Sequence, residues 1–444
     1  MDRVTMASTI ADRLGKRRLV WAGIRGDDVE PFTDIPQLDG AFSLISRYTR
    51  RSDVRSESYE ALTGVRVDPE IWDMDDHLEA PETREFRHHL LRALSSPSVL
   101  VAYRPSAFLS SIVFARHERC EPLNIFASLQ SALEHKPWVE TAVAQRGLAR
   151  IPWRYVADEE QLDASSQFDG GPLVLRRSRT SGGEGLTRVD SPADVSRHWP
   201  HISEAFVSVA PYISGGIPVN VGATVWRDGV TVHHPSVQLI GIDGLVTREF
   251  GYCGNDFGAA RDLDPAVIDE IETSTVKLGQ WLRRHGYLGS FGVDFLVHEG
   301  RALFTEINPR FQGSTHASAQ LDIEAGRPCL ALEHVAAWLG VPKPKSAPLR
   351  EVVAETPDFA HVVVHWPGDA AQLDTRALVA RARDEAGTVR VELDPAPGVV
   401  CEPGAAILRW TARRRLTTTG YELTPALAGF DANLVSAVTE GMTV

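Results

Sequence analysis

The sequence predicts a mixed α/β and α+β protein with about three domains. Its 444 residues and ordinary balance of apolar and charged side chains leave room for that many globular units. A buried apolar strand at 98–103 precedes a helix at 107–116, which is typical of an α/β domain. Two β-forming runs, 288–297 and 302–307, flank a polar turn and predict an antiparallel hairpin. The chain therefore combines an N-terminal α/β entry domain with antiparallel structure further along.

A proline-rich linker separates a small C-terminal domain from the rest. Three prolines lie between 342 and 348. We therefore place an N-terminal α/β domain at 1–120, a middle domain at 121–344 and a small α+β domain at 345–444. The C-terminal domain is expected to contain a strand, a helix and two further strands, at 361–366, 375–385, 388–393 and 406–412.

The clearest helix of the middle domain covers 264–286. Asp264 is its expected N-cap, Pro265 follows at the first helical position, and Gly286 is the stop. Apolar residues recur at helical spacing, at 267, 271, 278 and 282. This stripe is expected to be core and to carry no chemistry.

Composition excludes several classes of protein. A net charge of −13 without a basic tract argues against nucleic acid as a partner. No apolar run reaches about 18 residues, and the N-terminus lacks a signal-peptide core, so we expect a soluble cytoplasmic protein with no membrane contact. Four isolated cysteines predict reduced thiols. The adjacent His233 and His234 lack a third ligand at suitable spacing, so a zinc site is not expected.

The hairpin carries the most informative functional residues. Pairing centred on Gly300 would place Asp294 opposite Glu306, and Asn308 and Arg310 would follow on the same face by the period of two. Two opposed carboxylates repel each other unless a cation lies between them. Oxygen ligands of this kind suit Mg²⁺. The alternative is an ordinary hairpin whose charged side chains point into water.

The step from Asp294 to Glu306, followed by Asn308-Pro-Arg310, resembles the magnesium-binding signature of the ATP-grasp superfamily. The resemblance covers roughly residues 120–340. It implies an ATP-grasp fold, with ATP and two Mg²⁺ ions, or Mn²⁺ in their place, as cofactors. Asp294, Glu306 and Asn308 would be the metal ligands, and Arg310 would act on the reacting groups.

The same resemblance implies a lysine that opens the nucleotide domain and a glycine-rich flap, within a subdomain at about 171–230. Lys136, at a predicted helix start, matches the lysine. Where relatives often have a second lysine, this chain has Arg176, with Arg177 as the less favoured alternative, and Arg176 would hold phosphate together with Lys136. The glycine-rich loop that follows would cradle phosphate oxygens, although a surface turn would look the same: Ser181, Gly182, Gly183 and Gly185.

The hinge that would contact adenine follows the flap. Relatives often carry an acidic pair here, whereas this chain has Ala210-Pro211. Backbone groups near Val209 and Tyr212 would then recognise adenine, with Asn220 in place of the usual ribose carboxylate. Gln238 is a further candidate nucleotide contact.

Substrate contacts are expected in two segments. One, just past the metal strand, contains Gly313 and Ser314, and the other contains Arg248, Tyr252 and Asn255. With the long N-terminal part, these make the chain look similar to the pheganomycin-type peptide ligase and the butirosin-type amino acid–carrier protein ligase of natural-product (antibiotic) pathways.

Three functions stay open at this stage. The first is an ADP-forming ligase that joins a small-molecule carboxylate to an amine, such as an amino acid or peptide, through an acyl phosphate. The second loads an amino acid onto a carrier-protein thiol or phosphorylates a different acid, such as an enol. The third is a nucleotide-binding protein without turnover. A homodimer is an open alternative for the assembly.

Overall fold

The computed structural model describes residues 1–125, 127–159, 162, 171–178, 180, 182–199, 206–376, 379–380, 388–392 and 395–424. The predicted flap residue Ser181 and most of the predicted helix at 375–385 lie outside the described residues. No helix in the described part of the chain is long and apolar enough to cross a membrane. All four cysteines are buried free thiols.

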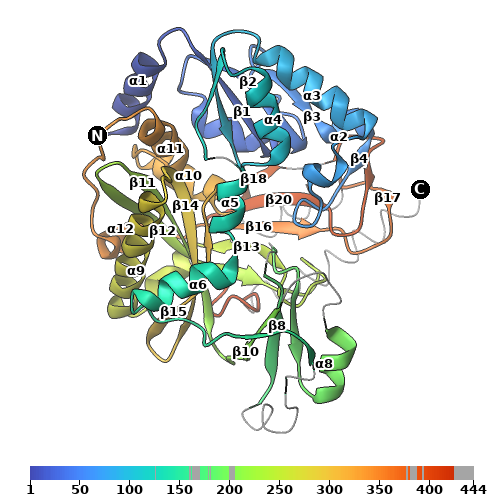
Figure 1. The fold of residues 1–444 in the computed structure, drawn as a ribbon, viewed down its shortest axis with the longest axis vertical. Coiled ribbons are helices and arrows are strands. Elements are labelled where there is room, and N and C mark those ends of the chain that lie inside the picture. Colours follow the sequence, from blue (N-terminus) through green and yellow to red (C-terminus); the bar gives the residue numbers. More distant parts are fainter. Residues whose placement is uncertain are drawn as a thin grey trace.

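The N-terminal domain is built on a five-stranded parallel sheet with helices on both faces (Figure 1). The strand order is β3 (Arg55–Ser58), β2 (Leu38–Ile45), β1 (Arg18–Arg25), β5 (Ser98–Ala102) and β6 (Cys120–Pro122). Apolar side chains of α3 (Pro81–Ala93) and α4 (Ala107–Ala115) pack on one face. On the other face, α1 (Arg3–Leu14) packs together with α11 (Leu330–Trp338) of the middle domain. The α/β entry domain predicted from 98–116 is confirmed.

An eight-stranded sheet runs through the middle of the molecule. Every neighbouring pair is antiparallel, in the order β15 (Arg301–Asn308), β14 (Gly289–His298), β11 (Ile217–Trp226), β12 (Gly229–Ile240), β13 (Tyr252–Asp256), β16 (Ala360–His365), β20 (Ala406–Ala412) and β18 (Thr388–Glu392). Its core is covered by α9 (Pro265–Arg284), the predicted helix, whose N-cap Asp264 accepts a 2.7 Å hydrogen bond from the Ala266 N–H.

The flap subdomain is a separate antiparallel sheet at the bottom of Figure 1. Its order is β7 (Arg154–Val156), β10 (Val207–Pro211), β8 (Leu173–Arg176) and β9 (Leu186–Val189), with α8 (Pro192–His198) packed against it. The glycine-rich loop joins β8 to β9, and its Gly183 lies close to the Phe250 carbonyl, in the segment between β12 and β13.

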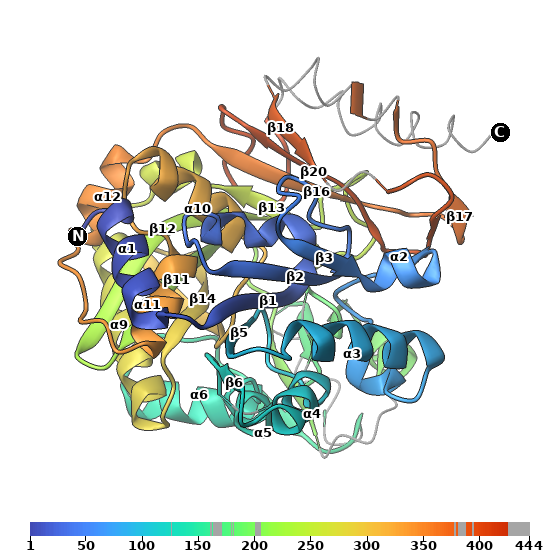
Figure 2. The same cartoon turned by 90° about the horizontal axis from the view of Figure 1, so that it is seen from above.

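The C-terminal strands are joined to both other parts of the molecule. β16, β18 and β20 continue the eight-stranded sheet beyond β13, so the sheet crosses the predicted boundary at 344. In addition, β19 (Val400–Cys401) pairs with β17 (Ala371–Gln372) and with the N-terminal strand β4 (Val65–Arg66). Figure 2 shows these strands beside the N-terminal sheet.

The two adjacent histidines belong to a buried ion network. His233 Nδ1 lies 3.0 Å from Asp322 Oδ2, and Nε2 lies 3.0 Å from Glu333 Oε2. His234 Nε2 is 3.2 Å from Asp322 Oδ1. Because both ring nitrogens of His233 are taken by carboxylates, the network ties α10 (Thr315–Glu324) and α11 to β12. It has no open position for a zinc ion at His233.

Removing the positive charge of His233 is expected to change the pH dependence of the free energy of unfolding. Burial alone lowers the pKa of His233, but Glu333 and Asp322 outweigh it and raise the pKa to about 10. Since this exceeds the unfolded value of 6.5, the stabilisation is complete below pH 6.5 and is lost as pH rises through 10. His233→Leu should cost roughly 3 to 5 kcal/mol at pH 7, because it removes the buried cation that lies between Asp322 and Glu333. The stability of the variant relative to wild type should recover towards pH 10.

Urea unfolding at several pH values tests this prediction, with His298→Leu as control. A difference in unfolding free energy between His233→Leu and wild type that does not depend on pH would contradict it.

Candidate active site

The register of the β14–β15 hairpin brings the two predicted acids together. Asp294 pairs with Glu306, as the sequence predicts, but by a different route. The turn is centred between Glu299 and Gly300, both at positive φ, and His298 pairs with Arg301. That register alone would pair Asp294 with Thr305. A register shift between Asp294 and Phe295 brings Glu306 opposite Asp294 instead.

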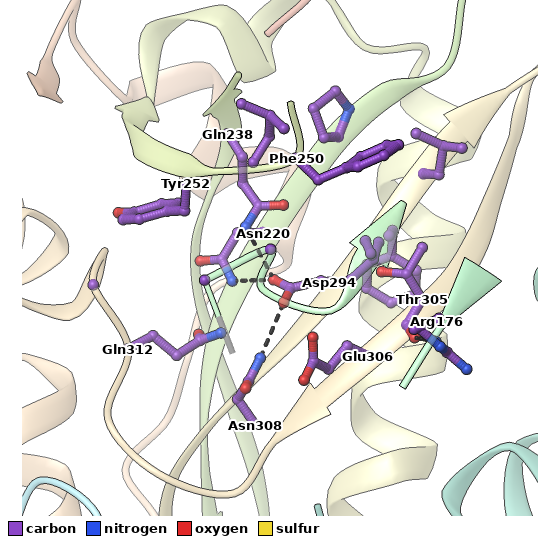
Figure 3. Close-up of a pocket in the computed structure, with 18 of the residues that line it drawn as sticks. Arg176, Asn220, Gln238, Phe250, Tyr252, Asp294, Thr305, Glu306, Asn308 and Gln312 are labelled. Atoms are coloured by element: carbon purple, nitrogen blue, oxygen red, sulfur yellow. Dashed lines mark hydrogen bonds between the residues drawn. The ribbon is translucent and has the colours of Figure 1, made fainter. Parts of the chain in front are cut away.

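Asp294 lies at the centre of a ring of carboxamides (Figure 3). Asn220 Nδ2 donates to its Oδ1 at 2.6 Å, and Asn308 Nδ2 donates to its Oδ2 at 3.0 Å. Gln238 Nε2 is 3.5 Å from Oδ1. Burial, followed by the repulsion of Glu306, raises the pKa of Asp294 to about 7. The ring therefore holds a carboxylate whose negative charge is costly without a cation.

Glu306 is held by Lys136, at the start of α6 (Lys136–Gln145). Lys136 Nζ lies 3.0 Å from Glu306 Oε1 and donates to the Thr180 carbonyl at 2.8 Å. Its backbone N–H donates to the Ser178 carbonyl at 3.3 Å. Lys136 is only 5% exposed, so the alternative of a solvated lysine does not apply. One buried ammonium thus links the acid pair to the flap.

These residues fit a divalent cation bound together with a phosphorylated ligand. Asp294 and Glu306 supply two facing carboxylates, and Asn308 Oδ1 has no hydrogen-bond partner among the described side chains. Mg²⁺ is typically held by one or two carboxylates, with phosphate oxygens and water in its other positions. The donor set and the raised pKa of Asp294 agree with such a site.

Arg176 approaches the same cavity from the flap subdomain. It is 2% exposed, and its guanidinium lies 3.8 Å over the Trp153 ring. It forms an ion pair with Glu140, while Nη1 donates to the Thr305 carbonyl at 3.3 Å. Arg176 is therefore a rigid, partly neutralised cation in the cavity wall.

Arg310 stands at the opposite side, beyond the end of β15. Its Nε lies 3.1 Å from Glu134 Oε1, and Nη1 donates to the Phe311 carbonyl at 3.1 Å. Arg104 Nη2 is 2.9 Å from the other Glu134 oxygen. Although burial alone raises the pKa of Glu134, the two arginines lower it overall. The carboxylate thus fixes two guanidinium groups side by side.

A cavity of about 280 Å³ connects these groups. Fourteen of the predicted residues line it: Lys136, Arg176, Gly182, Gly183, Tyr212, Asn220, Gln238, Tyr252, Asp294, Glu306, Asn308, Arg310, Gly313 and Ser314. Such a constellation of convergent polar groups in a concave, partly apolar site is the usual form of a ligand-binding cavity.

Four predicted residues lie outside this wall: Gly185, Val209, Arg248 and Asn255. Val209 is fully buried and pairs with strands on both sides, so its backbone belongs to the flap sheet. Arg248 Nη1 is 2.7 Å from Asp68 Oδ2. Asn255 is fully buried and accepts a hydrogen bond from the Tyr252 hydroxyl.

Asn220 lies beside the acid pair Asp294 and Glu306, whereas we predicted from the sequence that it would contact the ribose of ATP. It sits directly opposite Asp294 in the β11–β14 ladder. Its Oδ1 accepts a 2.7 Å hydrogen bond from Ser314 Oγ. The sequence did not reveal this position, because it depends on a strand pairing 74 residues apart.

Comparisons with known proteins agree with this geometry. A family model described as an ATP-grasp domain matches residues 141–314. The structure superposes with a TM-score of 0.59 on N5-carboxyaminoimidazole synthase from Aspergillus clavatus, at 13% identity over 95% of this chain and 99% of that one. With biotin carboxylase from Campylobacter jejuni the TM-score is 0.60, at 13% identity over 90% and 88% of the two chains. The chain has the ATP-grasp fold.

Sequence relatives are distant. The formate-dependent phosphoribosylglycinamide formyltransferase of Anaeromyxobacter dehalogenans (strain 2CP-C) is 22% identical over 303 residues, which are 64% of this chain and 74% of that protein. The enzyme of the same name from Nitratidesulfovibrio vulgaris (strain DP4) is 24% identical over 210 residues, and the match spans about half of it, 49%. This similarity supports the ATP-grasp fold but leaves the substrates open.

Several residues that line the ATP-grasp cavity were not predicted from the sequence. Tyr103 and Arg104 follow β5, and Glu70 lies near β4. Trp153, Phe250 and Tyr421 also line the cavity. Arg104 carried one usable signal, since it follows the carboxyl end of a predicted parallel strand, where ligand sites gather. Tyr421 carried none, because it reaches the cavity only through the C-terminal chain, where the Ile240 N–H donates to the Gly420 carbonyl.

The ATP-grasp flap is closed over the cavity. Gly183, at φ +78°, lies so close to the Phe250 carbonyl that an added Cβ would be 1.8 Å from its oxygen. The Tyr252 N–H also donates to the Gly182 carbonyl at 3.4 Å. Gly182 lies close to the side chain of Glu70, so the loop meets both the middle and the N-terminal domain.

Gly183→Ala is expected to hold the flap open. Its Cβ would overlap the Phe250 carbonyl, so closure and turnover should both be lost. Gly300→Ala is the matched control, since its φ of +71° gives the same backbone strain, about 1–2 kcal/mol, in open space. Hydrogen exchange across 178–187 should slow in wild type and in the control on adding a non-hydrolysable ATP analogue, but not in Gly183→Ala. Equal protection in both variants would contradict closure at Phe250.

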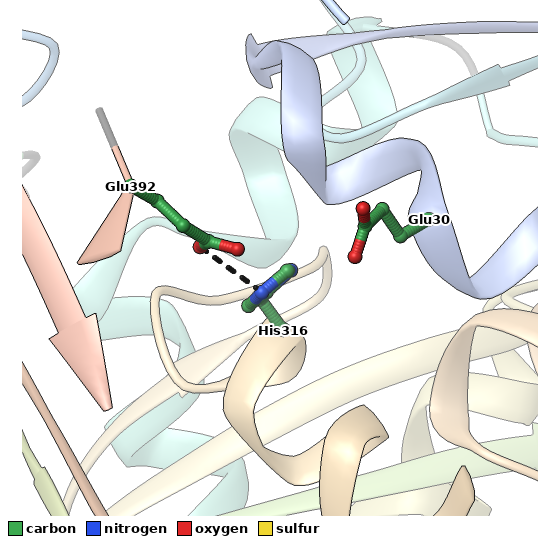
Figure 4. Close-up of side chains that lie close together, drawn as sticks. All are labelled: Glu30, His316 and Glu392. Atoms are coloured by element: carbon green, nitrogen blue, oxygen red, sulfur yellow. Dashed lines mark ion pairs between the residues drawn. The ribbon is translucent and has the colours of Figure 1, made fainter. Parts of the chain in front are cut away.

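A second group of possible ligands, Glu30, His316 and Glu392, lies apart from the cavity (Figure 4). His316 Nε2 is 3.3 Å from Glu392 Oε2. Arginines already neutralise both acids: Arg390 lies 2.5 Å from Glu30, and Arg409 lies 2.7 Å from Glu392. We interpret this cluster as an ion network that joins the N-terminal domain, α10 and the C-terminal strands.

Proposed function

We propose that this chain is an ATP-dependent ligase that joins a carboxylate to an amine through an acyl phosphate and releases ADP and phosphate. The observation that carries the proposal is the meeting of Asp294 and Glu306 on one face of a cavity, with Lys136 on one side and Arg310 on the other. Opposed acids with cations around them suit a transferring phosphoryl group.

The position of each residue in the cavity suggests its role in the reaction. Lys136 and Arg176 would hold phosphate oxygens as charge develops on them, and the closed flap would exclude water from the acyl phosphate. Asp294, Glu306 and Asn308 would hold one or two Mg²⁺ ions, which supply neutralisation of the phosphate charge when bound. Arg310, fixed by Glu134, would stabilise the oxyanion formed when the amine attacks the acyl carbon.

Adenine would lie against the apolar side of the cavity. Tyr212 and the neighbouring Ile213 line it there, and the Tyr212 ring is covered by Arg188 at 4.6 Å. Tyr212 is therefore the better supported of the two proposed hinge contacts.

A peptide or amino-acid ligase of natural-product biosynthesis is the finer form of this proposal, and loading of a carrier-protein thiol is its rival. The named relatives include formate-dependent enzymes, so a one-carbon acid belongs in any test. We propose an ADP-release screen over a matrix of acids and amines, including formate and amino acids, with mass spectrometry of the products. Release that requires both an acid and an amine supports the ligase. Binding of ATP without release for any pair would favour a nucleotide-binding protein without turnover.

A further inference from the structure

A second cavity, of about 160 Å³, lies at the carboxyl ends of the N-terminal parallel strands. We call it the aromatic chamber, because several aromatic and large apolar side chains line it, among them Phe42, Trp72, Met74, Phe86, Phe108 and Leu109. Its volume is that of a site for one ring, since an apolar protein cavity of about 150 Å³ takes up benzene.

The aromatic chamber adjoins the ATP-grasp cavity. Ile24, Pro69, Tyr103 and Arg104 line both cavities. Arg104 stands at this junction with its side chain 39% exposed, and among the described residues only Glu134, at 2.9 Å, accepts a hydrogen bond from its guanidinium. The remaining donors match the forked geometry of a carboxylate.

A buried acceptor without a partner lies in the wall of the chamber. Gln130, on α5 (Ala127–Leu133), is 1% exposed, and its Nε2 donates to Glu134 Oε1 at 3.0 Å. Its Oε1 has no hydrogen-bond partner in the described structure. An unmade hydrogen bond at a buried carbonyl costs about 1–3 kcal/mol, so a ligand N–H or O–H would be stabilised there.

The charges of the chamber disfavour a phosphorylated ligand. Asp73, Asp75 and Glu134 line it, and Arg104 is the one basic residue among its described lining. The Asp75 carboxylate is occupied, since it accepts from the Ala107 and Phe108 N–H groups at the start of α4. A sugar phosphate would therefore meet an excess of negative charge.

We propose that the aromatic chamber holds the body of the acid substrate, a carboxylic acid with an apolar, ring-sized group and a hydrogen-bond donor facing Gln130. Its carboxylate lies at Arg104, on the side of the ATP-grasp cavity. This inference rests on the proposed ligase function and narrows its substrate class. In the reaction, a carboxylate oxygen bonds to the γ-phosphorus while the bond from that phosphorus to the bridging oxygen breaks, and ADP leaves with the electron pair.

Hydroxylamine makes this step visible without knowledge of the amine. Its nitrogen attacks the acyl carbon, phosphate leaves, a proton is released and a stable hydroxamate remains. The full chain with Mg²⁺ and ATP is supplied with hydroxylamine and each of a set of acids: formate, acetate, aspartate, phenylalanine and hydroxyphenyl-acetate or -propanoate. Hydroxamate and ADP are then measured. We expect kcat/KM for the ring-bearing acids to exceed that for formate and acetate at least about 100-fold.

Met74→Trp should fill the aromatic chamber, and it tests whether the acid substrate binds there. Met74, on the 3-10 helix η2 (Met74–His77), lines the chamber but not the ATP-grasp cavity. Ile71→Trp is the matched control, since Ile71 is 57% exposed and lines neither cavity. Met74→Trp should lower hydroxamate formation from ring-bearing acids at least about tenfold, with ATP affinity unchanged, and Ile71→Trp should match wild type.

The outcomes separate the two proposals. Activation of formate, acetate or aspartate in preference to every ring-bearing acid would overturn the chamber assignment and leave the ligase intact. If no acid is activated, the ligase proposal fails, and calorimetric binding of the ring-bearing acids in the presence of a non-hydrolysable ATP analogue decides the chamber. Binding by wild type and by Ile71→Trp, but not by Met74→Trp, would support it. Binding that Met74→Trp does not weaken, or no binding at all, would overturn it.

Discussion

Replacing Glu306 by glutamine is expected to abolish ATP turnover while leaving the fold intact. The change keeps the side-chain shape but removes one of the two charges that would hold the cation, and it deprives Lys136 of its ion pair at 3.0 Å. We expect kcat to fall by about 10³-fold, the upper end of the loss typical when one electrostatic group of an active site is removed. The free energy of unfolding should change little, because the repulsion between Glu306 and Asp294 is removed with the charge.

Steady-state ADP release and urea unfolding on the same samples measure the two effects. Glu299→Gln is the matched control, because it makes the same substitution in the same hairpin on a side chain that is 84% exposed. It should behave as wild type. Normal ADP release from Glu306→Gln would remove the acid pair from the reaction.

Arg310→Ala is expected to bind ATP with near-normal affinity and to lose most of kcat. Arg310 lies beyond the acid pair and is tied to Glu134 on the side that adjoins Arg104, so we expect its charge to face the acyl group rather than the nucleotide. A loss of about 10²- to 10³-fold would be typical of a group that stabilises an oxyanion. Arg310→Lys should recover little, because a point charge cannot replace the guanidinium fork.

Calorimetric titration of ATP and ADP-release kinetics separate binding from chemistry. Arg301→Ala is the control, because Arg301, at the start of β15, is an arginine that pairs with Glu270 on the surface. A large loss of ATP affinity with unchanged kcat would place Arg310 in the nucleotide site and leave the oxyanion role to another residue.

Local pattern accounts for what the sequence predicted well. Helix α9 has a cap, a proline at its first position and a regular apolar stripe, all of which act within one element. The pairing of Asp294 with Glu306 also lies within one hairpin, so pairing centred on Gly300 was enough to predict it, although the structure reaches the same pairing through a register shift. The bulge that completes this register left no signal, because it depends on how the hairpin packs.

Contacts between distant elements explain what the sequence missed. Asn220 joins Asp294 only because β11 pairs with β14, and Arg104 joins Arg310 only through the shared Glu134. Val209 was predicted from an apolar strand end as an adenine contact, yet it lies in the middle of the flap sheet. The C-terminal strands looked like a separate domain after the proline-rich linker, whereas β16 extends the central sheet. Strand order is a tertiary property that residue spacing does not reveal.

The transfer of oxygen from the acid to phosphate tests the central claim most directly. The best acid from the hydroxylamine assay would be labelled with ¹⁸O in its carboxylate and turned over with Mg²⁺ and ATP, and the released phosphate would be analysed by ³¹P NMR. The account predicts ADP and one ¹⁸O atom in each phosphate, because a carboxylate oxygen attacks the γ-phosphorus. Unlabelled phosphate, or release of AMP in place of ADP, would contradict an acyl phosphate formed at Asp294, Glu306 and Arg310.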